Sequence, residues 1–516
     1  MSSEGLAAAV AKMEDAGVGH AAIAAFRRFY GMVEAGSNTH IREDDISGLT
    51  ELPHLDLHQT PTADDLAALD RVAVIKLNGG LGTSMGMREA KSLLHVRRGP
   101  VPLGNRFLAV PNLSKGRGFE TGLRPSLTDG SPDSSHPVTG SLSIVHEGAR
   151  TEEEMLTFLD IIAGQIQATR AATGARLPVM FMNSFRTQDD TRAALHRYPE
   201  LIVADDLPHD FLQNMEPKLL ASNLQPVTWP DDPELEWCPP GHGDLYPALF
   251  DAGIISSLLS HGYRYAFVSN ADNLGATPDP LVAGWFAASG APYAAEMCRK
   301  TEADIKGGQL VIRNWDQQLI QRETAQTHHE DIADALDAAK HPYFHTNNLW
   351  FDLEALQNAL SQTGGFLELP LIMNHKTVDP TDHNSPAVIQ IESAMGAAVA
   401  VFPGAQAVEV SRSRFLPVKT TEDLLVVRSD VFELTDDYRL VATAQAPIVK
   451  LSSHYRHIED FEERFPYGPP YLRGASSLTV EGDWVFGGEI TVTGNGYLPP
   501  GTGHVPDQTI ITAAGI

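Results

Sequence analysis

The sequence predicts an α/β fold, with a helical segment before the main domain and a β-rich segment after it. Stretches typical of buried strands alternate with helical stretches through the first two thirds of the chain; the strand-like ones lie at 72–77, 178–182, 264–268 and 308–312. Such alternation favours a sheet covered by helices. The 516 residues exceed one ordinary domain. We therefore expect a large α/β domain with smaller parts at both ends.

The first of these parts, residues 1–70, is expected to be helical. Apolar side chains recur at helical spacing between residues 5 and 35, with a break near Gly17 and Gly19. This spacing predicts one or two helices that lead into an acidic, proline-containing connector. The α/β domain is then expected at 71–430.

The last part, residues 431–516, carries a repeat of six residues. Its members are Leu478, Trp484 and Ile490, then Val480, Phe486 and Val492, and the glycines Gly482, Gly488 and Gly494. This period is typical of a parallel β-helix, in which six residues form one face of a coil. A two-stranded hairpin could imitate three repeats, so it stays an alternative. Either element would serve packing or oligomerisation.

One segment of the α/β domain breaks the alternation. Residues 98–149 are rich in Gly, Pro, Ser and Asn and show little periodicity. Long stretches of this kind inside a compact domain are functional lids, interaction loops or partly disordered segments. The sequence does not choose among the three.

Charge and cysteine content exclude several classes of function. The formal net charge of -28 argues against non-specific binding to nucleic acid or to an anionic membrane, because each needs a basic surface. An anionic substrate would be favoured as a metal complex. Cys238 and Cys298 are too few for a disulfide framework. Because no secretory signal and no apolar run of about 20 residues appear, we expect a cytoplasmic protein.

A glycine-rich loop follows the strand-like run at 72–77. It reads LNGGLGTSMG at 77–86, with Lys91 just beyond it. Glycines in such a loop let backbone N–H groups approach an anion. The loop is not a Walker A motif, and a dinucleotide fingerprint would need glycine where Met85 stands, which disfavours a dinucleotide-dependent oxidoreductase. A phosphate loop is predicted, with a glycine-rich turn that binds nothing as the alternative.

Polar residues follow the strand-like run at 264–268. Ligands in open α/β sheets bind at the carboxyl ends of strands, where this chain has Asn270, Asp272 and Asn273. A carboxylate there suits Mg²⁺, which takes one or two protein carboxylates together with phosphate oxygens. An Asx turn that merely closes the strand is the alternative.

Two further segments carry candidate ligands. His242 lies between glycines in PPGHGD at 239–244, a loop that could meet a phosphate or a sugar hydroxyl. Lys419 ends a basic block at 412–419 that also contains apolar residues, so this lysine could stabilise charge on a phosphoryl group. A surface histidine and a solvated charge cluster are the plainer interpretations. No nucleophile motif accompanies these residues, which favours direct transfer between bound substrates.

Together these motifs resemble the eukaryotic-type UTP–glucose-1-phosphate uridylyltransferases, also called UDP-glucose pyrophosphorylases. The resemblance runs from about residue 72 to 430 and rests on the glycine loop with Lys91, MNSF at 182–185, PPGHGD, FVSNADNLGAT at 267–277, KTEADIKGG at 300–308, TNNLW at 346–350 and RSRFLPVKTTEDLL at 412–425. The related UDP-N-acetylhexosamine pyrophosphorylases have Gln in place of Leu81.

The resemblance implies a Rossmann-like nucleotidyltransferase domain with a mixed sheet and a C-terminal left-handed parallel β-helix, through which a homo-oligomer could form. The phosphate of glucose 1-phosphate would attack the α-phosphorus of UTP in line, giving UDP-glucose and pyrophosphate. Lys91 and Lys419 would be catalytic, and Asp272 would hold Mg²⁺. The nucleotide would be bound by Leu77, Asn78, Gly79, Gly80, Lys91, Gln213, Gly241, Asp272 and Lys419, and the sugar phosphate by His242, Asn270, Glu296 and Asn347.

The chain departs from the family pattern in two places. Glu89 and Ala90 stand where the family has Gly-Pro before the lysine, which adds a carboxylate near a triphosphate. The segment 98–149 looks like an insertion. A UDP-sugar pyrophosphorylase of broader or different sugar specificity and a non-catalytic nucleotide-binding or assembly protein remain alternatives.

Overall fold

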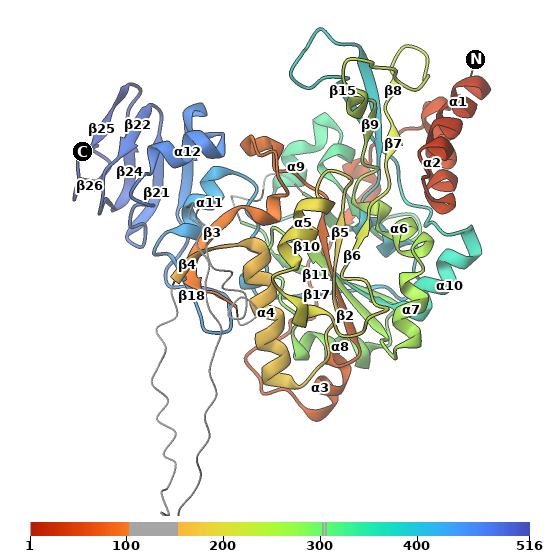
Figure 1. The fold of residues 1–516 in the computed structure, drawn as a ribbon, viewed down its shortest axis with the longest axis horizontal. Helices are drawn as coiled ribbons and strands as arrows, with labels where there is room; N and C mark the ends of the chain where they lie inside the picture. Colours follow the sequence, from red (N-terminus) through yellow and green to blue (C-terminus); the bar gives the residue numbers. More distant parts are fainter. Residues whose placement is uncertain (1, 103–152, 302–303, 305–306) are drawn as a thin grey trace, which may run out of the picture.

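The centre of the molecule is a seven-stranded mixed sheet (Figure 1). The computed structural model describes residues 2–102, 153–301, 304 and 307–516. Most of the predicted insertion at 98–149 therefore lies outside the described residues. In order across the sheet the strands are β17 (Gln406–Glu409), β11 (Tyr293–Arg299), β14 (Tyr343–Asp352), β10 (Tyr265–Asn270), β2 (Val72–Asn78), β5 (Val179–Asn183) and β6 (Asp210–Leu212). Only β14 runs antiparallel to its neighbours in this sheet.

The central strand β2 is buried on both faces, as its continuous apolar sequence predicts. Its one charged side chain, Lys76, is also buried. The Lys76 ammonium donates to Ser269 Oγ at 2.9 Å and to the Ala276 carbonyl at 2.7 Å. Burial, with the charge of Arg414, lowers the pKa of Lys76 to about 7. The lysine therefore belongs to the interior of the sheet and not to its exposed edge.

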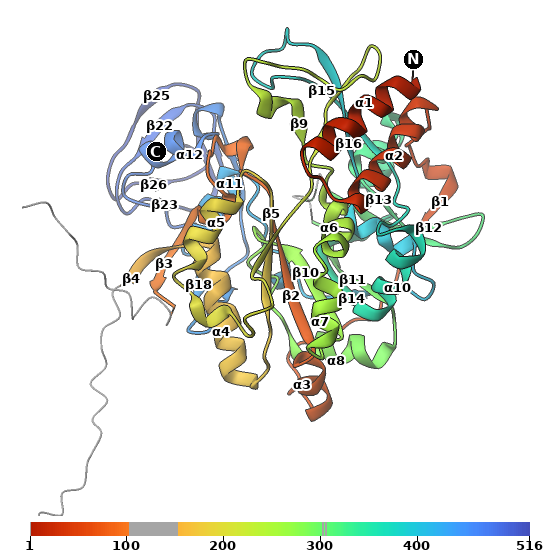
Figure 2. The ribbon, with the colours of Figure 1, turned by 45° about the vertical axis from the view of Figure 1, so that its right-hand side comes forward.

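Helices cover both faces of the sheet (Figure 2). One face packs against α3 (Ala63–Leu69), α4 (Phe158–Thr173) and α8 (Pro280–Ser289). The other face packs against α6 (Leu245–Asp251), α7 (Ile254–Ser260) and α10 (Leu353–Thr363), together with the N-terminal helices α1 (Ser2–Asp15) and α2 (His20–Glu34). The last two lie where the apolar spacing predicts helices, with the break at Gly17 and Gly19.

The C-terminal segment is built from short parallel strands that stack in three places. β21 (Ala475–Val480) pairs with β24 (Gly494–Leu498) and with β20 (Ile448–Leu451); β22 (Asp483–Phe486) pairs with β25 (Thr502–Val505), and β23 (Thr491–Val492) with β26 (Ile510–Ile511). In the β21–β24 pair residue 478 lies beside 496, and in the β23–β26 pair residue 492 lies beside 511. Paired residues in these two pairs are therefore 18 or 19 positions apart in the sequence. Parallel pairing excludes the two-stranded hairpin.

Smaller elements complete the chain. The remaining helices are α5 (Gln188–Leu195), α9 (Ile332–Leu336), α11 (Thr421–Arg428) and α12 (Ile458–Arg464). The remaining strands pair as β1 (Ile46–Gly48), β12 (Gln309–Arg313) and β13 (Leu319–Arg322); β15 (Ile372–Thr377), β16 (Ala387–Glu392) and β8 (Leu219–Leu220); β3 (His95–Pro100) with β4 (Glu153–Thr157); β7 (Glu216–Pro217) with β9 (Trp237–Cys238); and β18 (Phe432–Leu434) with β19 (Leu440–Ala442). No helix among the described residues is long and apolar enough to cross a bilayer. The cytoplasmic location stays a prediction.

Candidate active site

The predicted phosphate loop and the predicted metal ligand meet at the carboxyl ends of β2 and β10. These strands are parallel neighbours, and Leu77 pairs with Asn270 in their register. Just beyond the strands, the Ala271 N–H donates to the Leu77 carbonyl at 3.0 Å. The glycine loop and the loop that carries Asp272 therefore leave the same edge of the sheet side by side.

The glycine loop is held in place by hydrogen bonds at Asn78 and has free space beside Gly80. The buried Asn78 side chain donates to Asn183 Oδ1 and to Thr191 Oγ1, each at 2.9 Å, so its amide nitrogen holds the loop and does not face a ligand. A methyl group added at Gly80 would meet nothing within 4 Å, whereas one added at Gly79 would lie 2.6 Å from Gln213 Oε1. Gly79 must therefore be glycine for Gln213 to approach.

Gln213 links two of the predicted nucleotide contacts. Its Nε2 donates to the Gly241 carbonyl at 2.8 Å, and its Oε1 lies against Gly79. Gly241 itself has φ +77°, a left-handed conformation that favours glycine, and packs against the backbone of Ser393. Gly79, Gln213 and Gly241 thus lie together, and their contact with the base stays a prediction.

Lys91 and Asp272 form an ion pair at the carboxyl ends of β2 and β10. Lys91 Nζ lies 2.6 Å from Asp272 Oδ2, and both side chains are partly exposed. The other carboxylate oxygen, Asp272 Oδ1, is buried without a hydrogen-bond partner among the described residues. The Lys91 N–H donates to the Gly80 carbonyl at 3.1 Å, which fixes the lysine to the glycine loop. A carboxylate with one unused oxygen beside a cation suits a phosphate-bound metal.

Lys419 stands directly beside this pair, on a loop with a fixed backbone. The Val418 N–H donates to the Asp272 carbonyl at 3.2 Å. A capping box between Thr420 and Asp423 starts α11, and the Lys419 N–H also donates to Asp423 Oδ2 at 2.8 Å. The Lys419 side chain is exposed at the site, so its ammonium is available to a phosphate.

His242 is half-buried and held in one tautomer. Its Nδ1 accepts from the Met395 N–H at 3.0 Å, which leaves the proton on Nε2. Burial, and then the charge of Lys419, lower the pKa of His242 to about 4. The imidazole is therefore neutral at physiological pH and can donate one hydrogen bond to a bound phosphate or sugar oxygen.

Asn347 is half-buried, at the middle of β14. Its backbone has φ +59°, which asparagine tolerates better than most residues. Its Oδ1 is buried without a hydrogen-bond partner among the described residues. The predicted sugar contact is thus a side chain with an unused oxygen.

The structure contradicts the predicted sugar contact of Glu296. Both carboxylate oxygens are already occupied: Arg414 binds them at 2.6 and 2.7 Å, Asn348 Nδ2 donates at 3.0 Å and Trp350 Nε1 at 2.9 Å. The side chain is fully buried. Glu296 therefore serves the interior of the sheet and has no hydrogen-bonding capacity left for a hydroxyl.

Glu323 is the acidic residue that sequence reasoning missed. It follows β13 and accepts a hydrogen bond from Gln321 Nε2. Burial raises the pKa of Glu323, while the Gln321 hydrogen bond and the charge of Lys419 lower it. Only the folded chain brings Glu323 near Lys419, and no spacing around it in the sequence signals a ligand.

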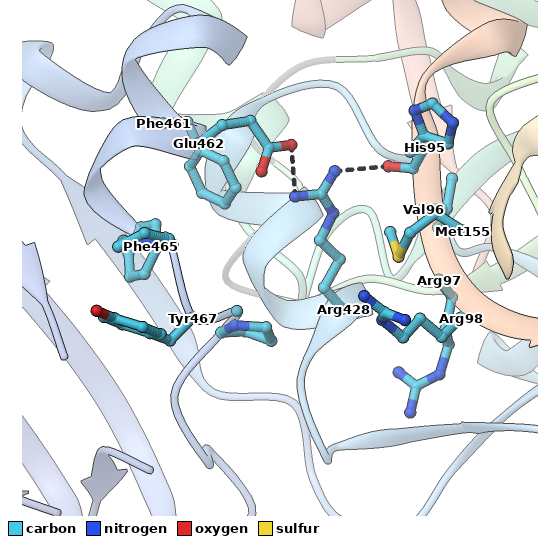
Figure 3. Close-up of a pocket in the computed structure, with 13 residues that line it drawn as sticks. His95, Val96, Arg97, Arg98, Met155, Arg428, Phe461, Glu462, Phe465 and Tyr467 are labelled. Carbon is cyan, nitrogen blue, oxygen red and sulfur yellow. Dashed lines mark hydrogen bonds and ion pairs between the residues drawn. The ribbon is translucent and has the colours of Figure 1, made fainter. Parts of the chain in front are cut away.

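A cavity of about 750 Å³ lies elsewhere, between β3 and α12 (Figure 3). It contains none of the predicted site residues. Arg428, on its wall, donates to the His95 carbonyl at 2.7 Å and pairs with Glu462 at 2.8 Å. Arg97 donates to the carbonyls of Val427 and Ser429. These arginines fasten β3 to α11 and α12.

A family model described as UTP–glucose-1-phosphate uridylyltransferase matches residues 23–110 and 147–493. The chain belongs to this family. The resemblance carried by the motifs is thereby confirmed. The Saccharomyces cerevisiae UTP–glucose-1-phosphate uridylyltransferase is 32% identical over 500 residues, which cover 94% of this chain and 86% of that protein.

Two solved structures resemble this chain over 99% of its length. A mutant UDP-glucose pyrophosphorylase of Leishmania major in complex with UDP-Glc superposes with a TM-score of 0.83 and 35% identity, covering 99% of this chain and 98% of that one. The Trypanosoma brucei UDP-glucose phosphorylase gives 0.80 and 35%, covering 99% and 100%. The mixed α/β architecture is thus shared with both uridylyltransferases.

Proposed function

We propose that this chain forms UDP-glucose and pyrophosphate from UTP and glucose 1-phosphate. The observation that carries the proposal is the meeting of the glycine loop, the Lys91–Asp272 pair and Lys419 at one edge of the sheet. This edge offers an open glycine loop, two lysines and one carboxylate oxygen that has no partner in the part of the chain that the structure describes. Such a set suits transfer of a nucleotidyl group, where positioning and charge neutralisation do most of the catalysis.

The reaction needs no covalent intermediate with the protein. A phosphate oxygen of glucose 1-phosphate attacks the α-phosphorus of UTP, and the bond from that phosphorus to the bridging oxygen of the β-phosphate breaks. Pyrophosphate leaves with the electron pair. Lys419 and Lys91 offset the negative charge on the triphosphate as it moves towards the leaving group. We infer that His242 donates its Nε2–H to an oxygen of the sugar phosphate, and that Asn270 and Asn347 contact the sugar. Glu323 is assigned to the same side because its carboxylate interacts with the charge of Lys419.

We propose Mg²⁺ as the cofactor, with Asp272 as its protein ligand. Asp272 Oδ1 is buried and unpartnered, and no cluster of three or more His, Cys, Asp or Glu side chains occurs in the described part of the chain. One carboxylate is what Mg²⁺ needs when phosphate oxygens and water complete its octahedron. When bound, the ion would neutralise phosphate charge and orient the triphosphate.

Release of pyrophosphate tests the proposal. The purified chain is mixed with UTP, Mg²⁺ and one sugar phosphate at a time: glucose 1-phosphate, galactose 1-phosphate or N-acetylglucosamine 1-phosphate. We expect rapid release with glucose 1-phosphate and loss of activity when EDTA removes the metal. Comparable rates with galactose 1-phosphate would make the chain a UDP-sugar pyrophosphorylase of broader specificity. No release with any sugar would leave a nucleotide-binding or assembly protein.

We also propose that the C-terminal stacks form a left-handed parallel β-helix that joins copies of the chain. The outermost strands β24, β25 and β26 end each stack, and Ile510 and Ile516 are 59% and 58% exposed beside them. Light scattering should give a mass above one chain, and Ile510→Asp should reduce it to that of a monomer. A monomeric unmodified protein would refute this part of the proposal.

A further inference from the structure

A group of unsatisfied polar atoms lies behind the sugar side of the site. Gln321 Oε1 and His345 Nε2 are both buried without a hydrogen-bond partner among the described residues. They belong to different elements, β13 and β14. A methyl group added at Gly396 would clash with Gln321 Oε1 and would come within 3.0 Å of His345 Nε2. The two atoms therefore flank the same point.

The two atoms have complementary polarity. His345 Nδ1 accepts from the Asn347 N–H at 3.0 Å, so the proton of the neutral ring is on Nε2. Burial, and then the nearby His242, lower the pKa of His345 to about 3, which keeps the ring neutral. Gln321 donates its Nε2–H to Glu323, which leaves its Oε1 as an acceptor. An unused donor thus lies close to an unused acceptor, and one hydrogen bond, direct or through a water, satisfies both.

We propose that His345 and Gln321 form a positioning pair that sets Asn347 and Glu323 against the sugar. His345 fixes the left-handed backbone of Asn347, and Gln321 fixes the carboxylate of Glu323. A hydrogen bond between His345 Nε2 and Gln321 Oε1, bridged by a water, would join the two halves into one unit. The arrangement requires glycine at position 396, because a side chain there would separate His345 from Gln321. The inference rests on the proposed function, since it assigns roles toward glucose 1-phosphate.

Three substitutions of His345 separate its two bonds. In His345→Asn the side-chain oxygen can take the place of Nδ1 and still accept from Asn347, while the Nε2 donor is lost. In His345→Gln the distal amide can take the place of Nε2, while the Nδ1 acceptor is lost. His345→Leu removes both. Steady-state kinetics with each substrate varied in turn should show a rise of about tenfold or more in KM for glucose 1-phosphate in the leucine variant. The asparagine and glutamine variants should fall between it and the unmodified chain.

The KM for UTP provides the internal comparison. The pair lies on the sugar side, so KM for UTP should stay within about twofold in every variant. Gln321→Leu should reproduce the effect of His345→Leu and keeps the inference testable if the histidine variant does not fold. The double variant should be no worse than the more impaired single variant, because each substitution breaks the same unit.

His341→Leu is the matched control. His341 is also a buried histidine in the chain just before β14, but its Nε2 contacts Glu43, away from the site. Its loss should lower the melting temperature without a selective rise in KM for glucose 1-phosphate. Equal rises in both KM values, or additive effects of Gln321→Leu and His345→Leu, would overturn the positioning role. An unmodified chain that releases no pyrophosphate would instead overturn the proposed function.

Discussion

Two ion pairs of the central domain, one at β11 and one beyond β10 with β14 between the two strands, have opposite characters. Glu296 and Arg414 are both buried, and every carboxylate oxygen of Glu296 accepts two hydrogen bonds. Lys91 and Asp272 are partly exposed, and Asp272 Oδ1 accepts none from the described residues. The sequence suggested ligand contacts for both acids. Unused hydrogen-bonding capacity, more than position on a strand, distinguishes the acid that can take a ligand.

The buried Glu296–Arg414 pair, the closed pair, should contribute mainly to stability. Arg414→Ala leaves Glu296 charged and buried without its partner, so the free energy of unfolding should fall by roughly 3–5 kcal/mol. Urea unfolding followed by circular dichroism measures the loss. Arg439→Ala is the control: it removes an ion pair with Asp437 in which the two side chains are 45% and 50% exposed, and should cost about 1 kcal/mol or less. Equal losses in the two variants would refute the comparison.

Lys419 lies beside the partly exposed Lys91–Asp272 pair, the open pair, and should affect the catalytic rate. Lys419→Ala should lower kcat by roughly 10²–10³, the effect of removing a donor that stabilises transition-state charge. Stability should change little, because the exposed ammonium makes no hydrogen bond or ion pair with the described residues. Lys450→Ala, which removes an exposed lysine on β20, should leave kcat unchanged. An unaltered kcat in Lys419→Ala would remove this lysine from catalysis.

The open pair itself should govern the metal requirement. Asp272→Asn keeps the shape of the side chain but lowers its affinity for a hard cation, so the Mg²⁺ concentration for half-maximal activity should rise at least about tenfold. Melting temperature should stay close to that of the unmodified chain, in contrast to Arg414→Ala. A variant with normal Mg²⁺ dependence would show that the ion binds elsewhere.

The half-buried His242 and the buried His345 should give the smallest effect, seen as a dependence of stability on pH. The folded pKa values of His242 and His345 are about 4 and about 3, below the ordinary value of 6.5. The unfolded chain therefore binds more protons below pH 6.5, and stability falls as pH decreases through this range. Between pH 7 and 5.5 each histidine should cost about 1 kcal/mol. His345→Asn should reduce the slope of unfolding free energy against pH.

Residues in continuous motifs could be predicted from the sequence. The glycine loop, Asp272 and His242 each follow a recognisable turn, and a strand must end before such a turn can present a ligand. The alternation of strands and helices likewise predicted the α/β class. These features are local, so they are visible in one segment at a time.

Glu323, His345 and the true role of Glu296 could not be predicted in this way. Glu323 becomes a candidate site residue because folding brings its carboxylate within reach of the charge of Lys419, 96 residues later. Glu296 is withdrawn from the site because Arg414, 118 residues later, occupies it. The order of the seven strands also depends on packing between distant segments. The roles of these residues depend on which hydrogen-bonding atoms are left without a partner after folding.

The open pair has a further consequence for the order of events during folding. Lys91 meets Asp272 across 181 residues, and Ser84 Oγ reaches the Lys419 carbonyl at 3.4 Å across 335 residues. Contacts between such distant segments require closure of long loops before any packing repays the lost entropy. Secondary structure can therefore form well before the lysines come together. During refolding, catalytic competence should return after the helices and strands, as one of the last properties that the chain acquires.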